Sequence, residues 1–289
     1  MKAIFKRELK YQFNTVTAPL YIAVLVMVCG IYFFVYNMNY GYPYFSYTLQ
    51  SILFIFTMIT PLLTMRIMAE DRRQKTDQLL LTSPATVRQI VLGKYFSMVA
   101  ILAIPCAIFC LCPLIIRLYG TAHFAIDYVG IFAFFLICCT YLSIGLLISS
   151  LTESLIISAV ATIGVFLLLL LAPSLAQNFL PTTASASLIG CIVILLLIAL
   201  IYYGFSKNWI VTFLILIIGG IALMAVYTLD SAVFENLITN LLQNLSIGDV
   251  LYNFTQYYTF DVAGIVKLVT ITALCLFASE QTVQKRRWS

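Results

Sequence analysis

Residues 46–76, SYTLQSILFIFTMITPLLTMRIMAEDRRQKT, contain the transition that decides the fold. Within this stretch, no charged side chain occurs before Arg66. A helix of about 20 residues is about 30 Å long, which matches the hydrocarbon core of a bilayer. Charged residues then follow closely, from Arg66 through Lys75. The stretch therefore predicts a transmembrane helix that leads into a charged segment outside the membrane.

The composition extends this prediction to the whole chain. Of its 289 residues, 63% are hydrophobic and only 9% are charged, and the mean hydropathy is +1.04. Ordinary soluble domains have about 45–50% apolar and about 25% charged residues. A transmembrane barrel would show short segments of alternating hydrophobicity instead of long apolar runs. We therefore expect an all-α, polytopic membrane protein.

The long apolar runs predict about eight transmembrane helices. Their approximate bounds are residues 18–38, 46–67, 95–118, 126–149, 155–173, 186–205, 209–229 and 262–279. The connections at 150–154 and 206–208 are very short, so the helices on either side of each should form antiparallel hairpins.

Two further segments have the periodicity of amphipathic helices. In residues 1–15, apolar side chains recur on one stripe and lysines on another, which is typical of an elbow helix in the membrane interface. In residues 230–248, apolar side chains from Phe234 onward recur at helical spacing opposite polar ones, and Gly248 is suited to end the helix. We expect this helix on the outer membrane surface, followed by a belt of aromatic residues at 252–260.

The distribution of basic residues predicts the orientation. With eight crossings, 14 of the 16 Lys and Arg residues fall on one side of the membrane, and the side rich in Lys and Arg is the cytoplasm. We therefore expect a multi-pass protein of the bacterial cytoplasmic (inner) membrane with both termini in the cytoplasm. The exceptions are Arg117 and Lys267, which either snorkel to the interface or contact a substrate. The net charge of +5 is accounted for by topology, so no nucleic-acid partner is expected.

The sequence offers no group of residues suited to catalysis. A membrane enzyme needs ionisable groups that converge at membrane depth. The single histidine, His123, is followed by Asp127 at a spacing that favours a solvated loop pair over a catalytic couple. Gly93-Lys94 lacks the upstream glycine of a phosphate-binding loop, and the cysteines lie in apolar runs without metal-site spacing. We predict no catalytic, cofactor or metal site in this chain.

Five short stretches together carry a family resemblance. They are residues 5–9 (FKREL), 68–84 (MAEDRRQKTDQLLLTSP), 87–94 (VRQIVLGK), 148–154 (ISSLTES) and 285–288 (KRRW). This set resembles the ABC-2-type permease family, especially its gliding-motility-like and copper-processing-like members. The likeness extends over nearly the whole chain.

The resemblance implies a cytoplasmic coupling helix after the second span, within residues 66–94, that docks in a cleft of an ATP-binding subunit. The positions that match the family pattern are Glu70, Asp71, Arg72, Thr76, Leu79 and Leu80. Lys75 stands where the family favours glycine, and Asp77 stands where it favours glutamate.

Two other predictions concern the cytoplasmic contacts. The charges of Arg72, Arg73 and Lys75 would determine which partner subunit binds and in which register it docks. Glu153 either makes a second cytoplasmic contact or caps the following helix.

As a member of this family, the chain would be a single transmembrane domain, residues 1–289, acting as the permease of an ATP-driven exporter. Its partners would be ATP-binding cassette ATPase subunits and a second copy or a related permease, with ATP and Mg²⁺ bound by the ATPase. The usual six spans are exceeded by an extra hairpin within 186–229, which either alters the substrate path or binds an accessory subunit. The alternatives are a stand-alone membrane scaffold or secondary carrier, and a membrane-bound transferase, which the absence of polar clusters disfavours.

Overall fold

The computed structural model describes residues 1–76, 86–179, 246–256 and 261–287, and single helical positions between 188 and 227. The chain divides into two compact units, one formed by Met1–Leu168 and Ile247–Ser289 and the other by Leu169–Ser246. The single functional domain expected from the sequence stays a prediction.

The described part of the chain is helical, and the structure assigns no strand to it. The elements are α1 (Lys2–Asn14), α2 (Thr17–Phe33), the π-helix η1 (Phe34–Asn39) that continues α2, α3 (Ser46–Arg73), α5 (Val87–Phe109), α6 (Cys112–Tyr119), α7 (Phe124–Leu151), α8 (Leu155–Phe179), α12 (Gly248–Gln256) and α13 (Val262–Arg287).

Among the residues that the structure describes, five helical segments, all in the first unit, are long and apolar enough to cross a membrane. They are Thr17–Asn39, Ser46–Arg73, Val87–Tyr119, Phe124–Leu151 and Val262–Lys285, and each contains or overlaps a predicted span. The predicted span at 155–173 corresponds to α8, whose apolar part, Leu155–Leu171, is shorter. The expectation of a multi-pass, all-α membrane protein is thus confirmed. The spans predicted at 186–205 and 209–229, and the amphipathic helix at 230–248, fall almost entirely outside the described residues.

The α3 helix is longer than the apolar run that predicted it. It continues through the charged residues to Arg73, so the first part of the expected coupling segment extends the same helix. The chain leaves it at Lys75, whose φ of 56° lies in the left-handed region that favours glycine. The next span also begins early, at Val87, because the Thr86 hydroxyl accepts a hydrogen bond from the Gln89 amide and caps the helix.

The α7 helix is the centre of the first unit, where it packs against α3, α5, α12 and α13. It is the most buried of the five spans, and α13 is the least buried. A Cβ atom on Gly145 would lie 2.7 Å from the side chain of Thr64, so glycine is what permits this close approach of α7 to α3. Edge-on contacts of Phe56 with Phe134 and Tyr141 fill the adjoining core.

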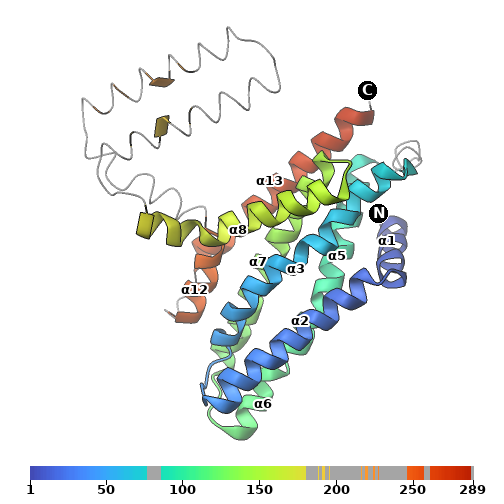
Figure 1. Cartoon of the computed structure of the whole chain (residues 1–289). Coiled ribbons are helices and arrows are strands. Elements are labelled where there is room, and N and C mark those ends of the chain that lie inside the picture. The colour runs from blue at the N-terminus through green and yellow to red at the C-terminus, as the bar shows by residue number, and fades with distance from the viewer. Residues whose placement is uncertain are drawn as a thin grey trace. The chain divides into compact units, whose positions relative to one another are not determined.

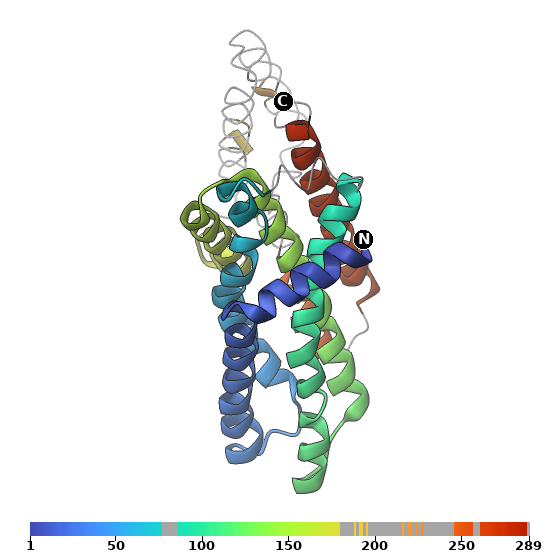
Figure 2. The ribbon, with the colours of Figure 1, turned by 90° about the vertical axis from the view of Figure 1, so that its right-hand side faces the viewer.

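Figures 1 and 2 show α2, α3, α5 and α7 running along one another, with α1 lying across α5 near one end. The N-terminus and the last turns of α13 lie at this end, and α6 lies at the other. We call the end with both termini the inner end and the end with α6 the outer end. The shared position of the termini agrees with the sequence-based topology. The assignment of the inner end to the cytoplasm stays a prediction.

At the outer end, buried Asn37 holds the tyrosine-rich turn before α3. Its side-chain nitrogen donates hydrogen bonds to the carbonyls of Tyr42 and Tyr44, at 2.9 and 3.1 Å. Its side-chain oxygen accepts a bond from the Thr48 hydroxyl at 2.8 Å. One amide side chain therefore satisfies backbone groups that the turn would otherwise leave without partners.

Asp127 has a similar role and corrects a prediction. It is 1% exposed and accepts a hydrogen bond from the backbone amide of Phe45 at 2.9 Å. The His123 ring stacks on Tyr44, with ring centroids 4.9 Å apart. The expected solvated loop pair is therefore wrong, because Asp127 is on the first turn of α7 and faces the start of α3.

The segment after the expected outer amphipathic helix also differs from its prediction. Gly248 begins α12, where it was expected to end a helix. The aromatic belt predicted from residue 252 starts inside this helix, and Phe254 is 3% exposed. Helical geometry explains the difference, because Val250, Leu251 and Phe254 share one face that packs against α7.

Candidate functional site

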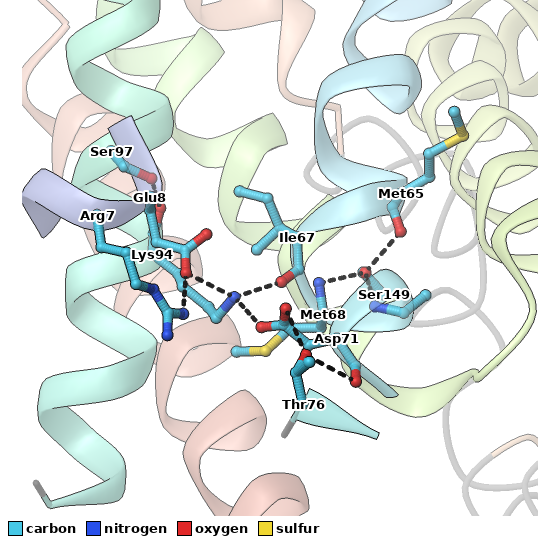
Figure 3. Close-up of polar contacts among 11 residues, drawn as sticks. Arg7, Glu8, Met65, Ile67, Met68, Asp71, Thr76, Lys94, Ser97 and Ser149 are labelled. Carbon is cyan, nitrogen blue, oxygen red and sulfur yellow. Dashed lines mark hydrogen bonds and ion pairs between the residues drawn. The ribbon is translucent and has the colours of Figure 1, made fainter. Parts of the chain in front are cut away.

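The inner end contains a fully buried lysine. Lys94, on α5, is 0% exposed, and its Nζ donates hydrogen bonds to the Ile67 carbonyl at 2.6 Å and to Asp71 Oδ2 at 2.5 Å, both on α3 (Figure 3). The Glu8 carboxylate, on α1, lies 3.4 Å from the same Nζ. The ammonium group therefore makes two hydrogen bonds to α3 and an ion pair with Glu8. One cation therefore joins α1, α3 and α5.

The charges around Lys94 balance. A buried ammonium is costly unless it is paired, and here Asp71 and Glu8 provide two carboxylates. Arg7, whose side chain is 52% exposed, forms an ion pair with Glu8 and supplies the second positive charge. The Thr76 hydroxyl donates to Asp71, to the carbonyl at 3.2 Å and to Oδ1 at 3.3 Å. We call these residues, with Ile67, the Lys94 network.

A glycine brings α1 close enough to reach this lysine. A Cβ atom on Gly93 would lie 3.1 Å from Ile4 Cγ2 and 3.6 Å from the Met1 carbonyl, so α1 crosses α5 directly over this residue. The dipeptide Gly93-Lys94, which is too short for a phosphate-binding loop, thus has a packing role. The absence of a side chain on Gly93 lets α1 approach α5, and Lys94 binds α1 through Glu8.

A second contact between α1 and α3 involves Tyr11. Partial burial, together with a hydrogen bond to Glu70, raises the pKa of the Tyr11 phenol above its ordinary value. The phenol is the donor in this hydrogen bond, because a carboxylate can only accept. The Gln74 side chain donates to the same carboxylate at 3.3 Å. Two carboxylates of the charged segment, at 70 and 71, are thus oriented toward neighbours within this chain.

Ser149, near the end of α7, binds α3 one turn before these carboxylates. Its Oγ accepts hydrogen bonds from the amides of Met68 and Ala69, at 3.2 and 3.1 Å, and donates to the Met65 carbonyl at 3.1 Å (Figure 3). In an α-helix the amide of residue 69 pairs with the carbonyl of residue 65, so this hydroxyl lies at that step of the backbone ladder. Such insertions are one cause of bending in helices.

Arg72 connects α3 to the turn after α7. The side chain is buried, and its NH1 donates a hydrogen bond to the Thr152 carbonyl at 3.3 Å. The next residue in that turn, Glu153, is exposed. The inner end of α3 is therefore bound to α1 and α5 on one side and to α7 and its following turn on the other.

The predicted coupling residues divide into three groups. Glu70, Asp71, Arg72 and Thr76 take part in contacts within the chain. Arg73, Lys75 and Glu153 are exposed. Asp77, Leu79 and Leu80 lie outside the described residues. The structure therefore brings the first group together around α3 and leaves the second group accessible to a partner.

Sequence reasoning missed several residues of this site, among them Glu8, Lys94 and Ser149. A signal for Lys94 was present, because Ile90, Val91, Ile101 and Leu102 place apolar residues one or two turns away on its own face. A charged residue on an apolar helix face suggests a buried partner of opposite sign. No comparable signal marks Glu8, which lies among basic neighbours.

The described residues offer no donor set for a metal, because no three His, Cys, Asp or Glu side chains gather to hold an ion. The arrangement instead joins helices through charge and hydrogen bonds. It attaches residues 65–76 to α1, α5 and α7.

The comparisons with known proteins agree with this architecture. A family model described as ABC-2 family transporter protein matches residues 6–187, which is more than half of the chain and includes the Lys94 network, from Arg7 to Lys94. No curated protein matches the chain. With its multi-pass helical fold and a match of this length, the chain belongs to the ABC-2 transporter family and is a membrane component of a transporter.

Proposed function

We propose that this chain is the permease subunit of an ATP-driven exporter, with hydrolysis carried out by a separate ATPase subunit. The observation that supports the proposal is the attachment of residues 65–76 to three other helices through Lys94 and Ser149. A solvated loop that only sets topology has no need of such attachment. A segment that receives force from a partner does need it.

In this mechanism, the exposed residues of the charged segment contact the ATPase. Arg73 and Lys75 are exposed, and their positive charges suit an acidic rim on the partner. Closure of the ATPase would displace residues 70–76. The buried cation of Lys94 would carry that displacement to α1 and α5, because packed elements with two discrete arrangements transmit motion between sites.

We further propose that Ser149 marks the place where α3 bends during this motion. Its hydroxyl already bonds to both ends of the Met65–Ala69 ladder step. When the backbone hydrogen bond between the Met65 carbonyl and the Ala69 amide breaks, the Ser149 hydroxyl can still bond to both groups. Bending at this position therefore costs less free energy than in a continuous helix. The last turn of α3, beyond Ala69, would then tilt relative to the membrane-spanning part of the helix.

The α1 helix has the surface expected of an interfacial elbow. Its buried face is polar, with Glu8 and Gln12 each 5% exposed, whereas Tyr11 and Phe13 are 44% and 38% exposed. Exposed apolar side chains beside exposed lysines suit a helix in the head-group region. Such a helix would follow the displacement of Lys94 along the membrane surface, with the inner end in the cytoplasm.

The remaining parts of the proposal follow from the family resemblance. The permease would work as a dimer with a second copy or a related permease, above two ATPase subunits that bind ATP and Mg²⁺. Transport would be outward, through a path between the two permeases. The rival function is a scaffold or secondary carrier that has no ATPase partner.

Affinity purification of the tagged chain from its native membranes, in a mild detergent, tests the proposal. The variants are Arg73→Glu at the inner end and Arg117→Glu at the outer end, two exposed arginines that differ in position. We expect an ATP-binding subunit with ATPase activity to accompany the wild type and Arg117→Glu, and to be reduced at least several-fold with Arg73→Glu. If no ATPase accompanies a monodisperse wild type, the scaffold or carrier becomes the leading account.

A further inference from the structure

A groove between α5 and α13 is not used by the proposed coupling mechanism. Its volume is about 430 Å³, within the range of about 300–1,000 Å³ that is typical of small-molecule sites. Five of its lining residues are apolar and two are charged. They are Val91, Leu92, Ala273, Leu276 and Phe277, with Arg88 and Glu280.

The two charges lie at one end of this groove. On α5, Arg88 precedes Val91 and Leu92 by three and four residues, which is one helical turn. On α13, Glu280 follows Phe277 by three residues and Ala273 by seven. Because α5 begins and α13 ends at the inner end (Figure 1), we expect both charges at the membrane interface. The apolar lining extends from them about one to two turns, or about 5–10 Å, toward the membrane centre.

Neither charge is neutralised within the described part of the chain. Arg88 is exposed and Glu280 is half-buried, and no ion pair joins them to each other or to another described residue. A planar guanidinium binds a phosphate through two parallel hydrogen bonds. A carboxylate accepts hydrogen bonds from a primary ammonium. Arg88 and Glu280 therefore complement a ligand that carries both a phosphate and a primary ammonium.

We propose that this groove binds a phospholipid with a phosphate and a primary ammonium, namely phosphatidylethanolamine. Arg88 binds the phosphate, Glu280 accepts from the ammonium, and one acyl chain lies along Leu92 and Phe277. The location favours a lipid over a soluble ligand, because α5 and α13 both span the membrane and Phe277 is 59% exposed. This site is independent of the proposed transport function.

The head-group chemistry gives the site a definite selectivity. Phosphatidylcholine has a quaternary ammonium with no hydrogen to donate to Glu280. Phosphatidylglycerol has no cation, so its phosphate would bind Arg88 while Glu280 stays unpaired next to an anionic lipid. An unselective lipid surface would treat all three alike.

Native mass spectrometry of the purified chain, with dioleoyl forms of these three lipids added singly and in pairs, tests the proposal. We expect phosphatidylethanolamine to bind roughly tenfold more tightly than either competitor, which corresponds to one charge-assisted hydrogen bond. Arg88→Gln should reduce the binding of all three lipids. Glu280→Gln should remove the preference and leave phosphate binding in place.

Two further variants separate the groove from its charges. Ala273→Phe fills the apolar part of the groove without changing its charge. It should reduce phosphatidylethanolamine binding about as much as Arg88→Gln does. The matched controls are Lys285→Gln and Val269→Phe, which alter α13 outside the groove and should bind as the wild type does. Each variant is scored only from its monodisperse, helical fraction. Equal binding of the three lipids by the wild type, or unchanged binding by Ala273→Phe, would overturn the proposal.

Discussion

The two ends of α3 are both held by buried polar groups, but the groups are of different kinds. At the outer end, Asp127 binds one backbone amide, and Asn37 binds two backbone carbonyls and a hydroxyl at the adjoining turn. At the inner end, one ammonium group binds a carbonyl and two carboxylates on two other helices. A cap stabilises the turn that it covers. A shared cation makes the positions of three helices depend on one another.

This difference suggests that the outer end is built to stay in place and the inner end to move as a unit. Loss of one outer hydrogen bond leaves its neighbours intact. Loss of the inner cation leaves two carboxylates facing each other inside the protein, so the energetic consequences reach α1, α3 and α5 together. Substitutions at the two ends should therefore differ in size and in how far their effects extend.

Lys94→Met is expected to have the largest effect. Breaking a buried ion pair by removing one partner costs about 3–5 kcal/mol, and here the remaining Asp71 and Glu8 also repel each other. Thermal unfolding in detergent, followed by circular dichroism, should show a clear loss of stability. The triple variant Glu8→Gln, Asp71→Asn, Lys94→Met removes all three charges and should recover part of that loss. A Lys94→Met protein as stable as the wild type would show that the lysine is not paired with these carboxylates.

A matched pair of isosteric changes sharpens the comparison. Asp71→Asn removes the charge that pairs with Lys94 and should cost about 1.5–3 kcal/mol, the usual contribution of a hydrogen bond to a charged group. Asp127→Asn keeps an oxygen for the Phe45 amide, and asparagine caps about as well as aspartate. Its effect should stay within about 0.5 kcal/mol. Equal losses of stability from the two variants would remove the distinction between the ends.

Acidification provides a third comparison, at the start of α13. The Asp261 side chain accepts hydrogen bonds from the Asn253 side chain at 2.9 Å and from the Gly264 amide at 2.8 Å. These bonds lower the pKa of Asp261 below its ordinary value. Because the pKa is lower in the folded state, the cap stabilises the protein above the unfolded pKa of about 3.9 and loses this contribution as pH falls through the folded value.

The expected result is a pH-dependent difference between the wild type and Asp261→Ala, which removes the capping carboxylate. The difference in their melting temperatures should be constant from about pH 7 to pH 5 and should shrink as the pH falls below about 4. Its size should correspond to a helix cap, about 0.5–2 kcal/mol. Melting curves of both proteins across this range measure it. A difference that grows on acidification would contradict a lowered pKa for Asp261 in the folded state.

The sequence predicted well those features that depend on the solvent around a segment. Runs of apolar residues located the five spans that the described part of the chain contains, because lipid requires about 20 such residues in a helix. It did not predict that the helix of the second span continues to Arg73, because Glu70 and Asp71 are as hydrophilic inside a continuing helix as in a loop. The helix continues because Lys94 and Tyr11 provide partners for those carboxylates, and partners from distant segments are not visible in a local pattern.

The candidate site shows the same limit. Glu70, Asp71, Arg72 and Thr76 were selected by their resemblance to a family pattern, and they lie together in the structure. Glu8 could not be selected, since three-dimensional proximity to Lys94 depends on the crossing of α1 over Gly93. Asp127 was assigned to a solvated loop, because a single acidic residue near a helix start gives no sign of which amide it will meet.

The smallest effect is expected at Lys75, where α3 ends. Its φ of 56° is a conformation that costs a non-glycine residue about 1–2 kcal/mol, and the family pattern favours glycine at this position. Lys75→Gly removes that strain, while the greater freedom of glycine in the unfolded chain offsets about 0.5–1 kcal/mol. A net stabilisation of about 0.5–1 kcal/mol should remain, measured as a slightly higher melting temperature. Lys75→Ala is the control, because it removes the same side chain but keeps the strain and should not stabilise. If alanine and glycine behave alike, the backbone at residue 75 does not limit stability, and the lysine is retained for its charge alone.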